Sequence, residues 1–334
     1  MSWKQYVRSV QAAQRREERA AARRYRELER AHKALQKQAE REYAAAEVAK
    51  YENYVELLVS VHVDGGPMWD WNRTAATPPP SQPVRGTARE MSARADLDSY
   101  RPGFFEKLFG GAKKRQAELE ALVAHARIQD ESEYQVALNV FRADLDRWNK
   151  EQWLAPRVLA HDPPACLAAL EHASAFAEVE TFGAKVRFEA IRNDVATLSC
   201  SITDPEVVPK EELKLTAAGK ISTKELPPSR YWTLFQDHVC SCALSVSRET
   251  FAVIPVTRAI VNVWVQQLNP ATGHVEPACM LAVHFTRRGL GGLRLEAVDP
   301  SDSMKNFNHR MKFKKSTGFE PVEPTSDEEG WVTT

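Results

Sequence analysis

Residues 2–61 contain neither proline nor glycine, and this run constrains the fold more than any other feature of the chain. It is rich in Ala, Arg, Glu, Gln and Lys, which lose little free energy on entering a helix. We therefore predict one long helix over residues 1–62. At 1.5 Å per residue it would extend about 90 Å, which exceeds the diameter of a small domain, so part of it must lie outside any globular core.

Large apolar side chains are few in the first half of this predicted helix. Leu28 and Leu35 join two alanines in a thin seam with spacings of three and four residues. The second half repeats the spacing with the larger side chains of Tyr51, Tyr54, Leu58 and Val61. Because a thin apolar seam stabilises a helix only when something covers it, the pattern predicts that this helix packs on another one.

The helix is predicted to end at Asp64-Gly65-Gly66-Pro67, where two glycines and a proline oppose further helical structure. Residues 63–101 contain four more prolines within 78–83 and many Ser, Thr, Arg and Ala. This composition predicts a flexible Pro-rich linker. Its aromatic pair, Trp69 and Trp71, either folds back onto the nearest helix or docks on a partner.

A second helical arm is predicted over residues 102–160, since residues 113–153 are again free of proline and glycine. Its apolar positions recur every three or four residues, which favours an antiparallel, coiled-coil-like hairpin with the first helix, or a dimer of such hairpins. The residues expected to form this helical interface are Leu28, Leu35, Leu58, Leu138, Phe141, Leu145 and Trp148.

The pattern changes after Pro156, and residues 161–319 are predicted to form an α+β domain with antiparallel strands. The expected elements are a strand hairpin over 186–202, a helix of about twenty residues from Ser229, two strands over 259–265 and 279–285, and a last helix over 301–313. Asp299 or Ser301 would cap that last helix. Residues 320–334 are predicted to be an acidic disordered tail. The predicted fold class is α+β.

Composition limits the class of protein. The chain has 45 Lys and Arg, 45 Asp and Glu and 43% hydrophobic residues, which excludes a uniformly basic coat protein and an acidic buffer. No apolar run approaches the ~20 residues that cross a bilayer, and the first thirty residues do not resemble a signal peptide. The five scattered cysteines form no disulfide framework. We therefore expect a cytoplasmic protein without membrane association.

No catalytic, metal-binding or cofactor-binding motif is found in the sequence. Cys240 and Cys242 are two residues apart on a predicted helix, so their side chains would point about 200° apart. The Gly219-Lys220 pair lacks the earlier glycine of a phosphate-binding loop. Asp299 and Asp302 are better explained as helix-start residues than as an acid and base pair. We expect no catalytic residue, no metal and no cofactor.

The predicted order of a helix, a strand hairpin and another helix is also the core layout of restriction-type nucleases. Those enzymes need an acid on one strand and an acid-x-Lys triplet on the next, because oxygen ligands hold the metal ion. The predicted strands over 259–265 and 279–285 carry neither feature. A domain of this kind would therefore be inactive.

Charge is distributed unevenly along the chain. Residues 1–50 contain 13 Lys or Arg and 7 Asp or Glu. Near the other end, five basic residues precede five acidic ones. The basic residues could bind a polyanion, and the acidic tail could occupy the same surface when no polyanion is bound. These possible polyanion-binding residues are Lys305, Arg310, Lys312, Lys314 and Lys315.

Together these features favour a non-enzymatic assembly or partner-recognition protein. The helical arm would bind a protein partner or a second copy of the chain, and the α+β module would bind a second protein or a ligand. The alternatives are a nucleic-acid-associated accessory protein or an inactive restriction-nuclease-like domain. A hydrolase whose site gathers His, Asp and Cys from distant segments would leave no sequence motif.

Overall fold

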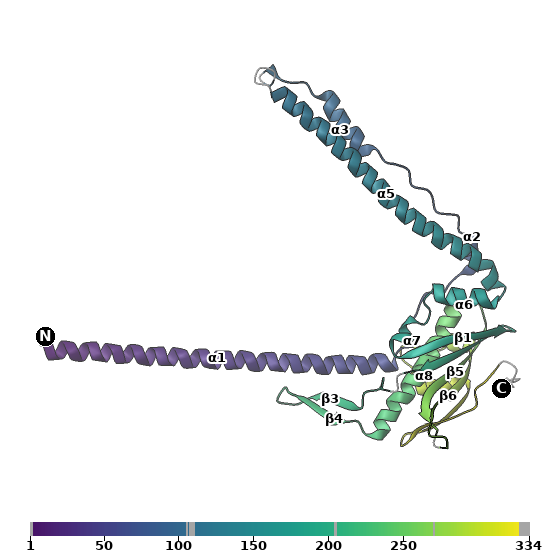
Figure 1. The fold of residues 1–334 in the computed structure, drawn as a ribbon. Helices are drawn as coiled ribbons and strands as arrows, with labels where there is room; N and C mark the ends of the chain where they lie inside the picture. The colour runs from purple at the N-terminus through teal and green to yellow at the C-terminus, as the bar shows by residue number, and fades with distance from the viewer. Residues whose placement is uncertain (1–2, 105, 107–110, 204–205, 270, 327–334) are drawn as a thin grey trace. The chain divides into compact units, whose positions relative to one another are not determined.

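The computed structural model describes residues 3–104, 106, 111–203, 206–269 and 271–326 (Figure 1). The chain has an α+β fold with long helices and a mostly antiparallel sheet. It divides into two compact units. We call residues 1–67 and 173–334 the sheet unit, and residues 68–172 the helical unit.

The sheet unit is built on six strands in the order β1-β2-β5-β6-β7-β8. The predicted hairpin is formed by β1 (Ala184–Arg192) and β2 (Val195–Ile202). Its turn places Asn193 and Asp194 in the left-handed region, with φ of 49° and 66°, which these residue types tolerate. The remaining strands are β5 (Arg258–Leu268), β6 (Val275–Thr286), β7 (Asn308–Lys314) and β8 (Gly318–Glu320).

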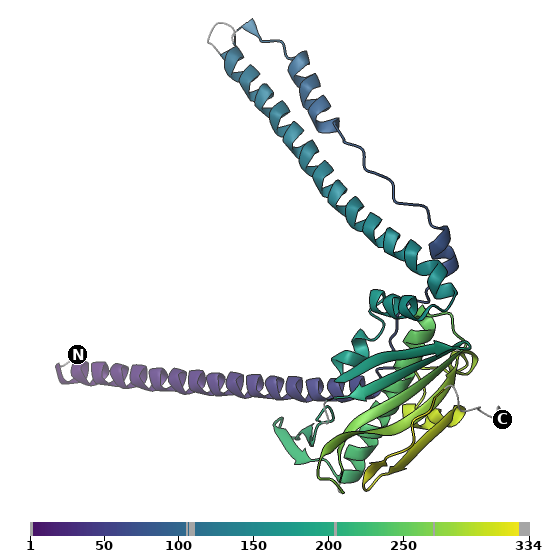
Figure 2. The same cartoon turned by 45° about the vertical axis from the view of Figure 1, so that its right-hand side comes forward.

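One strand pair differs from the antiparallel prediction, because β2 and β5 are parallel. A parallel pair needs a long crossover connection, and α8 (Pro228–Val253) supplies it. Figure 2 shows α8 lying against one face of the sheet. The core forms between this helix and β2, β5 and β6, and it includes Leu198, Leu244, Val261 and Leu281, all 0% exposed.

Short helices complete the sheet unit: α7 (Ala177–Thr181), α9 (Arg287–Gly291), α10 (Pro300–Ser303) and the 3-10 turn η1 (Met304–Asn306). Asp299 caps α10 by accepting a hydrogen bond from the Asp302 amide at 2.9 Å, as predicted. The predicted helix over 301–313 is helical only as far as Asn306, and the rest of the prediction is wrong, because the chain enters β7 at Asn308. Phe313 of β7 packs on Phe319 of β8, with 5.2 Å between the ring centroids. The two rings meet because residues 308–314 are extended and not helical.

The predicted disordered tail is also wrong for its first part. Glu320 belongs to β8, and the Val322 amide donates to the Cys279 carbonyl at 2.8 Å. Thr325 is buried, and its backbone exchanges two hydrogen bonds with the Asn262 side chain, at 2.9 and 3.0 Å. Residues 320–326 therefore pack on the sheet, while residues 327–334 lie outside the described residues.

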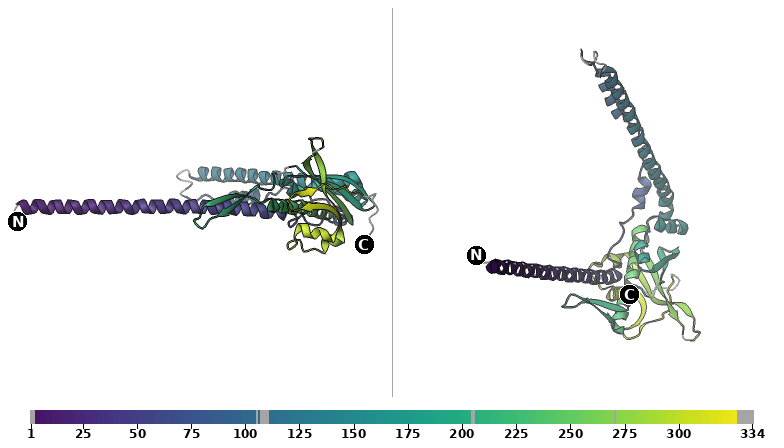
Figure 3. Two further views of the ribbon diagram at one scale, coloured as in Figure 1. Left: turned by 90° about the horizontal axis from the view of Figure 1, so that it is seen from below. Right: turned by 60° about the vertical axis from the view of Figure 1, so that its left-hand side comes forward.

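The first predicted helix is α1 (Trp3–Val59), which belongs to the sheet unit. Its second half packs on α8 and on a separate hairpin of β3 (Glu211–Leu215) and β4 (Ile221–Glu225). None of the elements expected from the sequence covers β3 or β4. Figure 3 shows that α1 continues well beyond this hairpin toward its N-terminus.

The helical unit contains α2 (Trp71–Ala76), α3 (Ala88–Ser99), α5 (Gly111–Leu159) and α6 (Pro163–His172). α3 packs along α5, where the Asp130 carboxylate accepts the Glu90 amide at 2.9 Å and Arg85 pairs with Glu131 at 2.7 Å. The flexible-linker prediction for residues 63–101 is thus wrong for α2 and α3. These helices cover α5, a role that we had predicted for the first helix.

Candidate interaction surface on the first helix

Two apolar faces of α1 point in different directions. An α-helix turns by about 100° per residue, so Ala44, Val48 and Leu58 lie on one face, and all three are buried in the sheet unit. Five exposed residues form a second face about 140° away. We call this second face the outer stripe, and it consists of Tyr25, Leu28, His32, Leu35 and Ala39.

The outer stripe has coiled-coil spacing. Its residues follow one another in steps of three, four, three and four, which gives the average of 3.5 that a heptad repeat requires. Leu28 and Leu35 occupy the d position, while the a position holds Tyr25, His32 and Ala39. Leu28 is 69% exposed and Leu35 is 67% exposed, so packing within the described part of the sheet unit leaves this face open.

The seven residues predicted to form one helical interface are divided among three places. Leu28 and Leu35 lie on the outer stripe, and Leu58 is instead 0% exposed in the core of the sheet unit. The four residues of the second arm, Leu138, Phe141, Leu145 and Trp148, are half-buried in the helical unit.

Within the helical unit, hydrogen bonds show which segment lies against the side of α5 that carries these four residues. The Trp148 indole nitrogen donates to the Thr77 carbonyl at 2.9 Å, and the Gln152 amide donates to the Thr74 carbonyl at 2.7 Å. The segment after α2 therefore runs along this end of α5. The outer stripe of α1 is left as the part of the predicted interface that remains exposed.

The end of α1 is held by polar side chains of α8. The Arg248 guanidinium donates from Nη1 to the carbonyl oxygens of His62 and Val63, at 2.7 and 2.5 Å. The Gly66 amide donates to the Glu249 carboxylate at 3.1 Å, and burial raises the pKa of Glu249. His62 and Val63 lie in the segment that follows α1, so Arg248 joins this segment to α8.

A histidine and a cysteine lie close together in the same region, but they do not form a nucleophilic pair. Cys242 Sγ is 3.7 Å from His238 Nε2, and His238 Nδ1 is 2.9 Å from the Leu58 carbonyl, to which it donates. Burial lowers the pKa of His238 to about 4 and raises the pKa of Cys242 well above its ordinary value. Both groups are neutral at pH 7, so this pair has a structural role.

The buried His238 makes the stability of the sheet unit depend on pH. Its pKa is about 4 when folded against 6.5 when free, so between these values the unfolded chain binds the extra proton and stability falls as pH falls. The cost of His238→Gln should therefore be about 2 kcal/mol smaller at pH 5.0 than at pH 7.0. Urea unfolding of both chains measures this difference, and an equal cost at the two pH values would refute the assignment.

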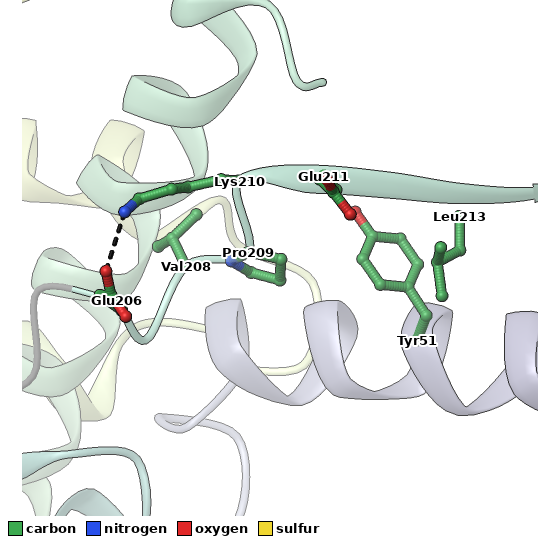
Figure 4. Close-up of a pocket in the computed structure, with 7 residues that line it drawn as sticks. All are labelled: Tyr51, Glu206, Val208, Pro209, Lys210, Glu211 and Leu213. Carbon is green, nitrogen blue, oxygen red and sulfur yellow. Dashed lines mark hydrogen bonds and ion pairs between the residues drawn. The ribbon is translucent and has the colours of Figure 1, made fainter. Parts of the chain in front are cut away.

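A shallow hollow of about 490 Å³ lies between α1 and the segment leading into β3 (Figure 4). Burial, followed by the nearby Glu212 charge, raises the pKa of Tyr51 on its wall. Lys210 pairs with Glu206 at 2.8 Å at the far side of the hollow from Tyr51. The described lining contains a phenol, carboxylates and an amine but no base paired with a nucleophile, so we assign it no catalytic role.

The predicted polyanion-binding residues largely interact within the chain. Lys305 pairs with Asp302 at 2.6 Å, and Lys314 pairs with Glu320 at 2.5 Å. Arg310 donates to the carbonyls of Glu323 and Pro324, at 3.5 and 3.3 Å. The first acidic residue after this segment thus meets the basic strand β7. The remaining two cations, Lys312 and Lys315, are exposed.

No cluster of three or more His, Cys, Asp or Glu able to hold a metal ion occurs within the described ranges. Among the same residues, no helix is both long and apolar enough to cross a membrane. No known protein family, curated protein or solved structure matches the chain. The exposed surfaces of the chain itself are therefore the basis for assigning a function.

Proposed function

We propose that this chain is an assembly protein that self-associates through α1, with the outer stripe of one copy packed against that of a second copy. The observation that supports this most is the separation of the two faces of α1. One face is already buried in the sheet unit, while Leu28 and Leu35 remain about two thirds exposed, at 69% and 67%. Burying them in a dimer would contribute roughly 1.5–3 kcal/mol for each leucine.

A second copy of the same helix fits this face better than an unrelated partner. Leucine is the d residue of two-stranded coiled coils, in which β-branched residues usually stand at a, and a single polar residue at an a position fixes their register. In this heptad Leu28 and Leu35 are the d residues, and His32 is a polar a residue. Identical helices in register would bring each of these side chains against its own counterpart.

Charge favours a parallel arrangement of the two helices. Arg24 occupies the g position before the outer stripe, and Glu29 occupies the next e position. In a parallel pair, a g residue lies beside the following e residue of the other helix. Two pairs of opposite charge would therefore flank the seam, one on each side.

Sedimentation equilibrium of the full chain tests this proposal. We expect the L28Q/L35Q double variant to dimerise at least tenfold more weakly than the natural chain. At concentrations where both chains are monomeric, the two melting curves should coincide, because both positions are exposed in the single chain. The control is I128Q/V136Q, which changes two equally exposed residues of α5, 67% and 62% exposed. An equal dissociation constant for the natural chain and L28Q/L35Q would contradict the proposal.

Replacing His32 with leucine gives the opposite test. A leucine pair buries more apolar area than a histidine pair at the same a position, so H32L should strengthen the dimer. Because His32 is exposed in the single chain, the variant should leave the fold unchanged. Weaker or unaltered association of H32L would show that His32 does not lie in the seam.

A further inference from the structure

α1 carries a second periodic surface, formed by cations. They follow one another in steps of three or four residues, which places them on one face of the helix. At 1.5 Å per residue, this face is about 33 Å long. We call it the basic stripe, and it consists of Arg19, Arg23, Arg26, Arg30, Lys33, Lys37 and Arg41, all of them exposed.

The basic stripe lies nearly opposite the outer stripe. With about 100° per residue, their centres differ by about 160° around the helix axis. Acidic side chains are absent from the basic stripe itself, because Glu27, Glu29, Glu40 and Glu42 lie in the two zones between the stripes. In the coiled coil proposed above, the cations would occupy outward-facing positions, so self-association would leave them accessible.

At its C-terminal end the basic stripe meets the β3–β4 turn. Arg41 donates from Nε to the Ala218 carbonyl at 3.3 Å, and a groove of about 610 Å³ lies between the helix and the turn. Lys33, Lys37 and Lys220 also line this groove. Glu40 is a carboxylate in the same lining, so the cations Lys33, Lys37, Arg41 and Lys220 outnumber it. Lys220 thus adds a cation from a separate element, and the groove carries a net positive charge.

Gly219 is what permits this close approach. Its φ is +75°, a conformation that favours glycine, and a Cβ atom there would lie 2.6 Å from Arg41 Cγ. The positive φ and the close contact with Arg41 each favour glycine at this position. With glycine there, the turn holds Lys220 beside the end of the basic stripe.

We propose that the basic stripe and Lys220 bind the phosphate backbone of a nucleic-acid duplex. One helical turn of a duplex is about 34 Å long, which matches the length of the stripe. Proteins that bind single strands add aromatic side chains on which bases stack, whereas the stripe consists of Arg and Lys alone. Contacts of this kind hold phosphates without reading sequence.

The arrangement of charges favours a duplex over an anionic membrane. A helix lying on a membrane buries its apolar face in the lipid, with Lys and Arg reaching the headgroups from the same side. In α1 the basic stripe is nearly opposite the outer stripe. Glu42 lies beside the outer stripe, and Glu29 pairs with Lys33 at the edge of the basic stripe at 2.6 Å. If α1 bound lipid through the outer stripe, the basic stripe would face away from the headgroups. If it bound through the basic stripe, the outer stripe would remain in water.

Salt-dependent binding of the full chain to a 5′-labelled DNA duplex of about thirty base pairs tests the proposal. The logarithm of the affinity should fall with the logarithm of the salt concentration, with a slope of about −0.9 for each phosphate contacted. The variant R23Q/R26Q/R30Q/K37Q should bind at least tenfold more weakly at low salt. Its slope should also be smaller in magnitude by about three to four, because four contacts are removed.

The matched control is K50Q/K185Q/R187Q/R288Q, which removes the same charge from exposed positions outside the basic stripe. It should retain the affinity and slope of the natural chain. Equal losses in both variants would show that net charge, and not the stripe, binds the duplex. Binding to phosphatidylserine vesicles but not to the duplex would also overturn the proposal. Thermal melting verifies that both variants fold.

Discussion

Replacing Arg248 with alanine is expected to lower the free energy of unfolding of the sheet unit by about 2–4 kcal/mol. The substitution removes two charge-assisted hydrogen bonds from Arg248 to the carbonyls of His62 and Val63. These carbonyls follow the end of α1, and they lose the guanidinium as a donor. R248K is the control, because it keeps the charge but only one donor group. Hydrogen exchange of amides in β5, within the sheet core, measures the loss.

Gly65 provides a second way to disturb the same contact. A Cβ atom at this position would lie 1.8 Å from Arg248 Nη2, so G65A must move the guanidinium. Its cost should therefore resemble that of R248A, and the double variant should cost no more than about 1 kcal/mol beyond either single one. Fully additive costs would show that Gly65 and Arg248 act independently.

Replacing Asn262 with alanine is expected to cost about 2–3 kcal/mol and to release residues 321–326 from the sheet. The Asn262 side chain both donates to and accepts from the backbone of Thr325, at a buried position where water does not replace it. Amide exchange at Thr325 and Val322 should quicken at least tenfold. N308A, on exposed β7, is the control.

Continued protection of Thr325 in N262A would contradict this account of the segment. It would mean that contacts other than the Asn262 pair hold residues 321–326. The Val322 bond to Cys279 is the alternative anchor, since it involves only backbone atoms and survives the substitution. Comparing the two amides separates these cases, because each reports one contact.

Local signals predicted much of the sheet unit. The absence of proline and glycine predicted α1, and the strand pattern over 186–202 predicted the β1–β2 hairpin. The strand patterns over 259–265 and 279–285 likewise predicted β5 and β6, which are paired in the structure. In each case, the residues that determine the structure are neighbours in sequence, so their pattern is sufficient.

The predictions failed where distant segments determine the structure. Met304, Phe307 and Met311 have helical spacing, yet β6 pairs with β7 and draws residues 308–314 into the sheet. α3 is short and polar, and it is stabilised by its contact with α5 and not by an apolar pattern of its own. The spacing of residues within β7 or α3 does not reveal that β6 or α5 will pack on it.

The candidate surface was predicted only in part. Leu28 and Leu35 were assigned to an interface from their spacing. Leu58 lies 23 residues after Leu35, which turns it about 140° around the helix, and it faces the core, where α1 packs on α8. The excess of cations over residues 1–50 was noted in the sequence, but the residues of the basic stripe were not identified, because charges were counted in blocks of sequence. Sorting the same cations by helical face would have revealed it, since Arg19, Arg26 and Lys33 are each seven residues apart.

Disulfide crosslinking at residue 28 tests the central claim, self-association through the outer stripe, most directly. In a parallel pair, L28C places two thiols against each other, and mild oxidation should yield a covalent dimer of twice 37.6 kDa. The five natural cysteines are buried and will not react in the folded chain. R30C, on the outward-facing basic stripe, should not form the covalent dimer. Equal crosslinking of L28C and R30C, or none in L28C, would contradict the claim.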